Sequence, residues 1–184
     1  MNMPQLGRDA RWFALLMIVV ATVAMAAPAN AQVGGGDFSL SGDEPVQVDG
    51  DRLEVLEDEG IAVFEGNVRV VQGETVLRTG KLVIHYARGG GESMATGGAQ
   101  IDRLEASGGV NIQTATQVAT GENGSYDMGT EVLTLSGERV TLSEDGNVAT
   151  GCLLTVDMRA NRSRLEGCDD AGSRPTILIQ PQSR

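Results

Sequence analysis

Residues 62–70 read Ala-Val-Phe-Glu-Gly-Asn-Val-Arg-Val, and this stretch indicates the fold. Apolar or small residues stand at every second position, and Glu65, Asn67 and Arg69 stand between them. Successive side chains of a β-strand point to opposite faces, so a period of two places the apolar set on one face of a sheet. A helix would need apolar residues every three to four positions. The stretch therefore predicts a half-buried β-strand.

The same pattern recurs along the chain as a repeat with two parts. Glycine opens the first part in three segments: 65–70, 107–112 and 136–142. Glycine also opens the second part, with one further copy ahead of the first: Gly50, Gly80, Gly121 and Gly151. These four glycines are 30, 41 and 30 residues apart, and the longer interval contains a glycine-rich insertion at 88–98. The spacing predicts one repeated pair of strands about every thirty residues.

Turn residues separate the predicted strands, in four segments: 57–60, 128–130, 144–147 and 159–161. Their Gly, Asn and Asp residues supply the positive φ angles that hairpins need. After Leu135 the alternation resumes one position late, at Val140, which predicts a β-bulge near Glu138. No stretch after residue 31 has helical periodicity. The sequence therefore predicts an all-β, antiparallel fold.

Residues 1–31 have the features of a cleavable signal peptide. Two arginines precede an apolar run at 12–27, and Ala29-Asn30-Ala31 forms an A-x-A cleavage site. We expect cleavage before Gln32 and export to the periplasm by the general secretory route, because no Arg-Arg pair is present. An uncleaved anchor is the alternative, but the run is short for a membrane span of about 20 residues.

Cleavage would leave 153 residues, enough for one domain with a hydrophobic core. We expect a flexible segment at 32–44 and a single β-domain at 45–184. The remaining chain has 12 basic and 24 acidic residues. This negative charge repels phosphate backbones, and no basic patch offsets it, so the sequence argues against nucleic-acid binding.

The sequence offers little for catalysis or for a cofactor. His85 is the only histidine, so any Ser-His-Asp or Cys-His arrangement would need it. Two cysteines and one histidine do not complete a structural zinc site. The insertion 88–98 lacks the Gly-Lys-Ser/Thr ending of a phosphate-binding loop. We therefore predict a protein that is not an enzyme and that uses no metal or cofactor.

Cys152 and Cys168 are predicted to form a disulfide. Both follow the signal peptide and would enter an oxidising compartment. If 159–161 is a three-residue hairpin loop, the numbers of paired residues sum to 320, and Cys152 stands opposite Cys168. A two-residue loop would change the sum to 321 and misalign them, which leaves free thiols as the alternative.

The repeats also resemble a known family. Four blocks carry the resemblance: FEGNVRVVQGETVLRTGKLVIHY at 64–86, EASGGVNIQ at 105–113, ATGENGSYDMGTEVLTLSGERVTL at 119–142 and ATGCLLTVDMRANRSRLEG at 149–167. They resemble the OstA-type repeat of the LptA family of lipopolysaccharide-transport proteins. The resemblance implies a periplasmic, open β-jellyroll whose interior carries the acyl chains of lipopolysaccharide. It also implies head-to-tail contacts, with further copies and with LptC-like inner-membrane and LptD-like outer-membrane partners, that bridge the two membranes for outer-membrane assembly.

Two interpretations of the inward residues remain open. They fill a plain sandwich core, which their composition favours, or they line a trough for a long apolar ligand, which the resemblance favours. The same alternative applies to function, because an LptC-like domain or a structural β-repeat protein would not conduct lipid. For the trough we predict lipid contacts at Phe64, Val68, Val70, Val83, His85, Val110, Ile112, Tyr126, Leu135, Val140, Leu142, Leu154 and Val156.

The first and last strands are predicted to leave open edges. The first lies around 45–55, and the last, at 176–180, is bounded by two prolines that limit its length. Unpaired edge groups can pair with a strand of another molecule. We therefore predict an interface at six apolar residues: Val46, Val48, Leu53, Ile177, Leu178 and Ile179.

Overall fold

The computed structural model describes residues 38, 45–87, 99–168 and 174–181, all within a unit of residues 32–184. The predicted signal peptide, the insertion 88–98 and the predicted flexible segment other than Phe38 lie outside the described residues. No helix in the described part of the chain is long and apolar enough to cross a membrane.

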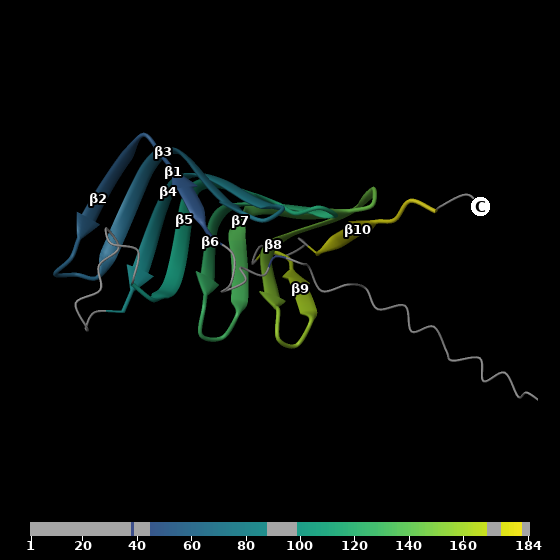
Figure 1. The fold of residues 1–184 in the computed structure, drawn as a ribbon. Coiled ribbons are helices and arrows are strands. Elements are labelled where there is room, and N and C mark those ends of the chain that lie inside the picture. The colour runs from purple at the N-terminus through teal and green to yellow at the C-terminus, as the bar shows by residue number, and fades with distance from the viewer. Residues whose placement is uncertain (1–37, 39–44, 88–98, 169–173, 182–184) are drawn as a thin grey trace, which may run out of the picture. The chain divides into compact units, whose positions relative to one another are not determined.

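The described residues form one antiparallel sheet of ten strands (Figure 1). The strands are β1 (Gln47–Asp49), β2 (Arg52–Leu56), β3 (Ile61–Gln72), β4 (Thr75–Tyr86), β5 (Ile101–Gln113), β6 (Gln117–Asp127), β7 (Val132–Glu144), β8 (Asn147–Asp157), β9 (Arg162–Glu166) and β10 (Thr176–Leu178). Their order is β1-β3-β4-β5-β6-β7-β8-β10, with β2 also on β3 and β9 also on β8. The order follows the sequence, as successive hairpins require. The all-β fold is confirmed, and the sheet does not close into a barrel.

All the long strands are interrupted at one level of the sheet. The pairing register shifts between Glu65 and Val68 in β3, and equivalent shifts cross β4 to β8. At the same level one edge of the sheet changes from β1 to β2, which both pair with β3. The other edge changes from β10 to β9, which both pair with β8. A bulge bends the strand that contains it, so a row of bulges bends the whole sheet. Figure 1 shows β3 to β8 bending together.

The bend divides the sheet into two leaves. The first leaf contains residues 52–56, 61–65, 81–86, 101–107, 123–127, 132–136, 153–157 and 162–166. The second leaf contains residues 47–49, 68–72, 75–79, 110–113, 117–120, 140–144, 147–150 and 176–178. The inner faces of the two leaves enclose the hydrophobic core.

The bulge in β3 shows how the sequence specifies the bend. Gly66 and Asn67 have φ angles of 78° and 49°, which glycine and asparagine tolerate. The Asp51 backbone N–H donates to the Gly66 carbonyl at 2.9 Å, and the Asn67 side-chain amide donates to the Asp51 carboxylate at 2.8 Å. A Cβ atom at residue 66 would collide with that carboxylate. Residue 66 of β3 must therefore be glycine, at the level where β1 ends and β2 begins.

The bulge predicted near Glu138 is confirmed, because the β7–β8 register shifts between Ser136 and Val140. The shift restores the inward direction of Val140, which is fully buried, as is Leu135 before it. A two-residue turn, Asp145-Gly146, joins β7 to β8, and both residues have positive φ.

The core contains aligned side chains from successive strands. Leu82 of β4 pairs with Ala106 of β5, and across β6 the same level continues to Leu135 of β7 and Leu154 of β8. Leu82, Leu135 and Leu154 are among the largest fully buried side chains. Burying such a side chain contributes about 1.5–3 kcal/mol, so the inner faces stabilise the bent sheet.

The prediction that Val83 and His85 face the interior is wrong. Leu82, Ile84 and Tyr86 are the buried residues of this half of β4. Val83 and His85 therefore lie on the outer face, where the sheet places alternate side chains. The side chain of His85 is partly exposed, and its Nε2 lies 3.7 Å from the carboxylate of Glu105.

A one-residue offset in the first repeat explains this error. Val110 of β5 pairs with Thr79 on one side and with Gly121 on the other. An alignment by the Thr-Gly motifs matches Gly80 with Gly121 and so predicts the wrong face for the rest of β4. Thr79 occupies the inward position, and its Oγ1 donates to the carbonyl of Ser107 at 2.8 Å.

The predicted register of the last hairpin is also wrong by one position. Asp157 pairs with Arg162 and Leu154 with Leu165, so the paired numbers sum to 319 instead of 320. The loop contains four residues, 158–161, because Asn161 takes a positive φ and the Asp157 carboxylate accepts from the N–H of Ala160. Cys168 lies just beyond the end of β9.

Candidate functional site

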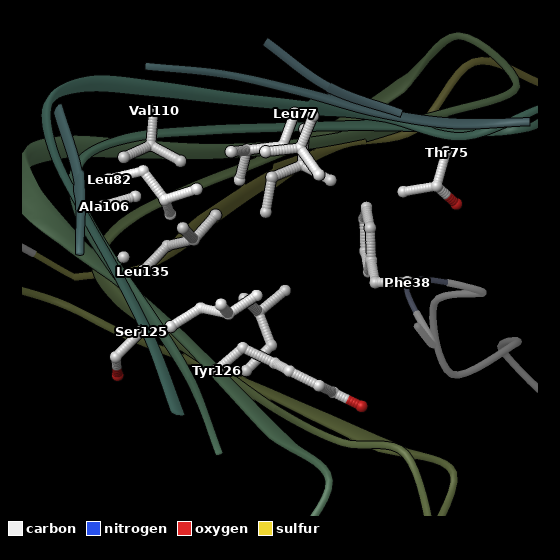
Figure 2. A pocket seen from close by; sticks show the side chains of 14 residues that line it. Phe38, Thr75, Leu77, Leu82, Ala106, Val110, Ser125, Tyr126 and Leu135 are labelled. Carbon is white, nitrogen blue, oxygen red and sulfur yellow. The ribbon is translucent and has the colours of Figure 1, made fainter. Parts of the chain in front are cut away.

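An apolar cavity of about 50 Å³ lies between the two leaves (Figure 2). Strands β3, β4 and β5 supply its second-leaf wall, with Val70, Thr75, Leu77, Val110 and Ile112. Strands β4 to β7 supply its first-leaf wall, with Leu82, Leu104, Ala106, Gly124, Ser125, Tyr126, Leu133 and Leu135. Phe38, which precedes the first strand, completes the lining. Side chains of both leaves therefore line the cavity.

The chemistry of the lining is almost entirely apolar. None of the fourteen lining residues is charged, and only Thr75, Ser125 and Tyr126 have polar side-chain atoms. In the described ranges, no cluster of three or more His, Cys, Asp or Glu residues could hold a metal ion. Apolar lining with a few hydroxyl groups suits the binding of a hydrocarbon chain.

Gly124 makes room within the wall of the cavity. A Cβ atom at this position would lie 2.9 Å from Cδ2 of Leu135 and 3.5 Å from Cγ1 of Val110. Side chains of these two residues therefore approach the β6 backbone closely. The glycine at this position keeps the cavity open between β5 and β7.

The structure brings most of the predicted lipid-contact residues together. Val70, Val110, Ile112, Tyr126 and Leu135 line the cavity. Val68, Val140, Leu154 and Val156 are buried in the same core, and Phe64 and Leu142 pack against it. Val83 and His85 do not belong to this set. Contact of these residues with lipid stays a prediction.

Sequence reasoning missed several lining residues. Leu77, Leu82, Leu104 and Leu133 follow the alternation of their strands and could have been found once each bulge was placed. Phe38 follows no repeat, and its aromatic character is the only signal that it carries.

The predicted interface residues lie at the two ends of the sheet. Val46 and Leu53, near β1 and β2, and the three residues Ile177, Leu178 and Ile179, in or just after β10, are 42–65% exposed. Among the residues that the structure describes, these five are the large hydrophobic side chains that are exposed. Val48 is half-buried and packs against the core. Contact of these residues with a partner stays a prediction.

Charged residues lie on the outer face of the first leaf. Lys81 and Arg52 flank Glu65, with N–O distances of 3.0 Å and 3.5 Å. The hydrogen bond from Lys81 and the positive charges lower the pKa of Glu65. Arg103 similarly contacts Glu105 at 3.0 Å. The sheet therefore separates a charged, solvated outer face from an apolar inner one.

Tyr86 is a buried phenol at the rim of the first leaf. Tyr86, at the end of β4, donates a hydrogen bond from its hydroxyl to the Glu57 carboxylate at 3.1 Å. Burial raises the pKa of Tyr86, and the hydrogen bond and negative charge of Glu57 raise it further. The phenol therefore stays protonated at neutral pH and fixes the turn at 57–60 to the end of β4.

A disulfide joins Cys152 of β8 to Cys168, with a Cα–Cα distance of 5.0 Å. In the observed register Gly167, one position past the end of β9, would continue the pairing opposite Cys152. The bond therefore reaches diagonally to the next residue. It ties the chain after β9 to β8.

Two known proteins have sequences similar to this chain. A protein of Rhizobium meliloti (strain 1021) is 40% identical over 166 residues, which cover 90% of this chain and 86% of the relative. A shorter relative from Rhizobium etli, described as a protein in an rpoN-linked probable transport protein 5′ region, is 44% identical over 48 residues, 26% of this chain and 83% of the relative.

The crystal structure of LptH from Pseudomonas aeruginosa has the same fold. LptH is described as the LptA-homologous periplasmic component of the conserved lipopolysaccharide transport device. The match has a TM-score of 0.61 at 19% identity and covers 75% of this chain and 96% of LptH.

Residues 47–162 match the family described as the LptA/(LptD N-terminal domain) LPS transport protein. The matched residues include β3 to β8, which form the bent sheet and its cavity. The chain therefore belongs to the LptA and LptD N-terminal domain family of lipopolysaccharide-transport proteins.

Proposed function

We propose that this protein works in the periplasm, where it binds lipopolysaccharide by its acyl chains and passes it along the interior of the bent sheet. The observation that carries the proposal is the continuous apolar inner face of a sheet that bends on itself without closing. Family membership and export by a predicted signal peptide support the same conclusion.

The chemistry of the interior suits acyl chains better than head groups. Each buried methylene group contributes about 0.8 kcal/mol, so a chain of several carbons binds well without any charged contact. The protein has a net charge of −11, and the lining contains no cation that could hold a phosphate. In this proposal the sugars and phosphates remain in water outside the leaves.

The exposed ends of the sheet support a bridge between membranes. The edge at β1 and β2 and the edge at β10 both leave apolar side chains exposed, on opposite ends of the strand order. Edge strands present unpaired N–H and C=O groups that pair readily with another strand. One end of a copy would join the other end of the next, or of LptC-like and LptD-like partners, in an open series.

A structural β-repeat or an LptC-like domain without lipid conduction is the second candidate. The observation that favours it is the small spare volume, because about 50 Å³ does not hold an acyl chain. Lipid binding would require the leaves to separate or a side chain to leave the interior. A plain core would do neither.

Displacement of an environment-sensitive dye separates the two candidates. Purified protein is equilibrated with anilinonaphthalene sulfonate, which fluoresces in apolar sites, and titrated with purified lipopolysaccharide. The proposal predicts saturable loss of dye fluorescence. A wall substitution, Leu135→Ala, should weaken the effect. Val76→Ala should not, because Val76 stands between the lining residues Thr75 and Leu77 of β4 and therefore faces outward. A protein that binds neither dye nor lipopolysaccharide would favour the plain core.

A further inference from the structure

Phe38 occupies the interior although it does not belong to any strand. Its side chain is only 3% exposed and lines the apolar cavity. Figure 2 shows its ring between the leaves, with Thr75 of the second leaf and Tyr126 of the first leaf on either side. Both of these residues lie near strand ends that are remote from the bend. Phe38 therefore fills the interior on its open side.

We infer that Phe38 is a tethered plug, which occupies an acyl-chain position of the trough and must leave before lipid enters. The inference rests on the proposed function and adds a regulation of the same site. It explains why the interior holds an apolar cavity and yet has little spare volume. Removing one phenyl ring from among these side chains would enlarge that volume without moving either leaf.

The position of Phe38 in the sequence suits a displaceable side chain. Six residues, 39–44, separate it from the described chain at Pro45. A chain extends by about 3.3–3.6 Å per residue, so the seven steps from residue 38 to residue 45 reach no more than about 25 Å. The ring therefore stays within about 25 Å of Pro45 even when it has left the interior. Phe38 is thus always available to refill the interior when lipid leaves.

The relative sizes of the competing groups allow exchange. A phenyl ring buries less apolar surface than an acyl chain of ten or more carbons, and hydrophobic stabilisation is proportional to the buried area. The acyl chain therefore displaces the ring at sufficient lipid concentration, and the ring lowers the apparent affinity of every chain that needs its place by the same factor. Competition of this kind would favour release of lipid to the next binding site.

The first test follows the plug itself. The sequence has one tryptophan, Trp12, in the predicted signal peptide, so F38W in a Trp12→Phe background places a single fluorescent indole at the plug position. Without lipid, emission should be blue-shifted and protected from iodide quenching. Saturation with purified lipopolysaccharide should shift the emission to longer wavelength and expose the indole. Unchanged emission while lipid is bound would overturn the inference.

The second test measures affinity with a dodecyl fatty acid that carries a fluorophore. Phe38→Ala should tighten its binding about tenfold, which corresponds to about 1.4 kcal/mol. The outer-face control Val76→Ala should leave it unchanged, and the wall variant Leu135→Ala should weaken it. Equal or weaker binding by Phe38→Ala would show that Phe38 is a wall residue and overturn the plug. If neither the parent protein nor Phe38→Ala binds lipid, the proposed function fails, and the plug fails with it.

Discussion

Leu135 is fully buried and stands between Gly124 and Leu154 on the neighbouring strands. Leu135→Ala should lower the free energy of unfolding by about 2–5 kcal/mol, because it removes buried methyl groups and leaves a cavity. Thr134→Ala, on the opposite face, should change it by only about 0.5 kcal/mol. Urea denaturation of both variants checks the difference, and similar losses in the two would contradict the assignment of faces.

Asp127 caps the turn between β6 and β7. Its carboxylate accepts hydrogen bonds from the backbone N–H of Thr130 at 2.7 Å and from the Thr130 hydroxyl at 2.8 Å. The Thr130 bonds hold the pKa of Asp127 below its ordinary value of 3.8. Since the folded pKa is depressed, the stabilisation is fully present above pH 3.8 and is lost as the pH falls through the folded pKa.

Thr130→Val tests this cap because it removes only the hydroxyl bond. The pKa of Asp127 should rise toward its ordinary value, and stability should fall less steeply on acidification. A carbon-detected NMR titration of the Asp127 carboxyl measures the shift, and Thr134→Val is the remote control. An unchanged Asp127 titration in Thr130→Val would contradict the role of the hydroxyl.

Residue facing could be predicted from sequence where alternation continues through a strand. In β3 and β5 the inward residues have even numbers on both sides of the bend. Alternation alone therefore predicts correctly that four residues face inward: Val68, Val70, Val110 and Ile112. Phe38 could not be predicted, because its burial depends on a contact with strands distant in the sequence rather than on a local period.

The disulfide stabilises the β8–β9 hairpin. Cys152 and Cys168 are 16 residues apart, and closing a loop of about this length stabilises a fold by about 3 kcal/mol in the chain-entropy account. The double substitution Cys152→Ser with Cys168→Ser should lower the free energy of unfolding by about 2–3 kcal/mol. Urea denaturation of the oxidised protein and of the double variant measures the loss.

Formation of the bond in the periplasm has its own measurement. Exported protein is alkylated without reduction and weighed by mass spectrometry. No cysteine should be alkylated, because the two thiols are joined. Two alkylatable thiols would contradict the prediction.

The strand pairs and the bulge near Glu138 were predictable, but the positions of the other bulges were not. Turn residues such as Asp145-Gly146 specify a hairpin locally, through positive φ angles. A bulge is a property of two strands, and one inserted residue reverses every side chain that follows it. The local sequence at Thr79-Gly80 is the same as at Thr120-Gly121, yet the pairing offsets them by one position. Val83 and His85 were misplaced for this reason.

At the scale of the whole molecule, β10 provides the edge that we expect to assemble. Deleting residues 174–184 should abolish concentration-dependent oligomers, because it removes the exposed apolar residues and the edge hydrogen-bonding groups of β10. The monomer should stay folded and bind lipopolysaccharide, since the cavity lining is untouched. Light scattering across a concentration series measures the change.

Two further variants complete that experiment. Deleting only residues 182–184 leaves β10 intact and should preserve the oligomers. Leu53→Asp, at the opposite end of the sheet, should weaken them as the longer deletion does. Oligomers that persist in the protein lacking 174–184 would contradict assembly through this edge.

The repeat of about thirty residues predicted the topology of the molecule, because successive hairpins produce a sheet in sequence order. The space between the leaves could not be predicted. It depends on how far the row of bulges bends the sheet and on which side chains, Phe38 included, enter between the leaves. Lipid transport therefore needs a direct test of the interior.

Photocrosslinking in cells at two adjacent residues of β5 tests the central claim most directly. Val110 is buried and lines the cavity, whereas Asn111 lies on the opposite face of the same strand. A photoreactive amino acid is placed at each position in turn, and the irradiated protein is blotted for lipopolysaccharide. We predict a crosslinked lipopolysaccharide adduct from position 110 and none from position 111. Equal capture at both positions, or capture at neither, would contradict an interior that carries acyl chains.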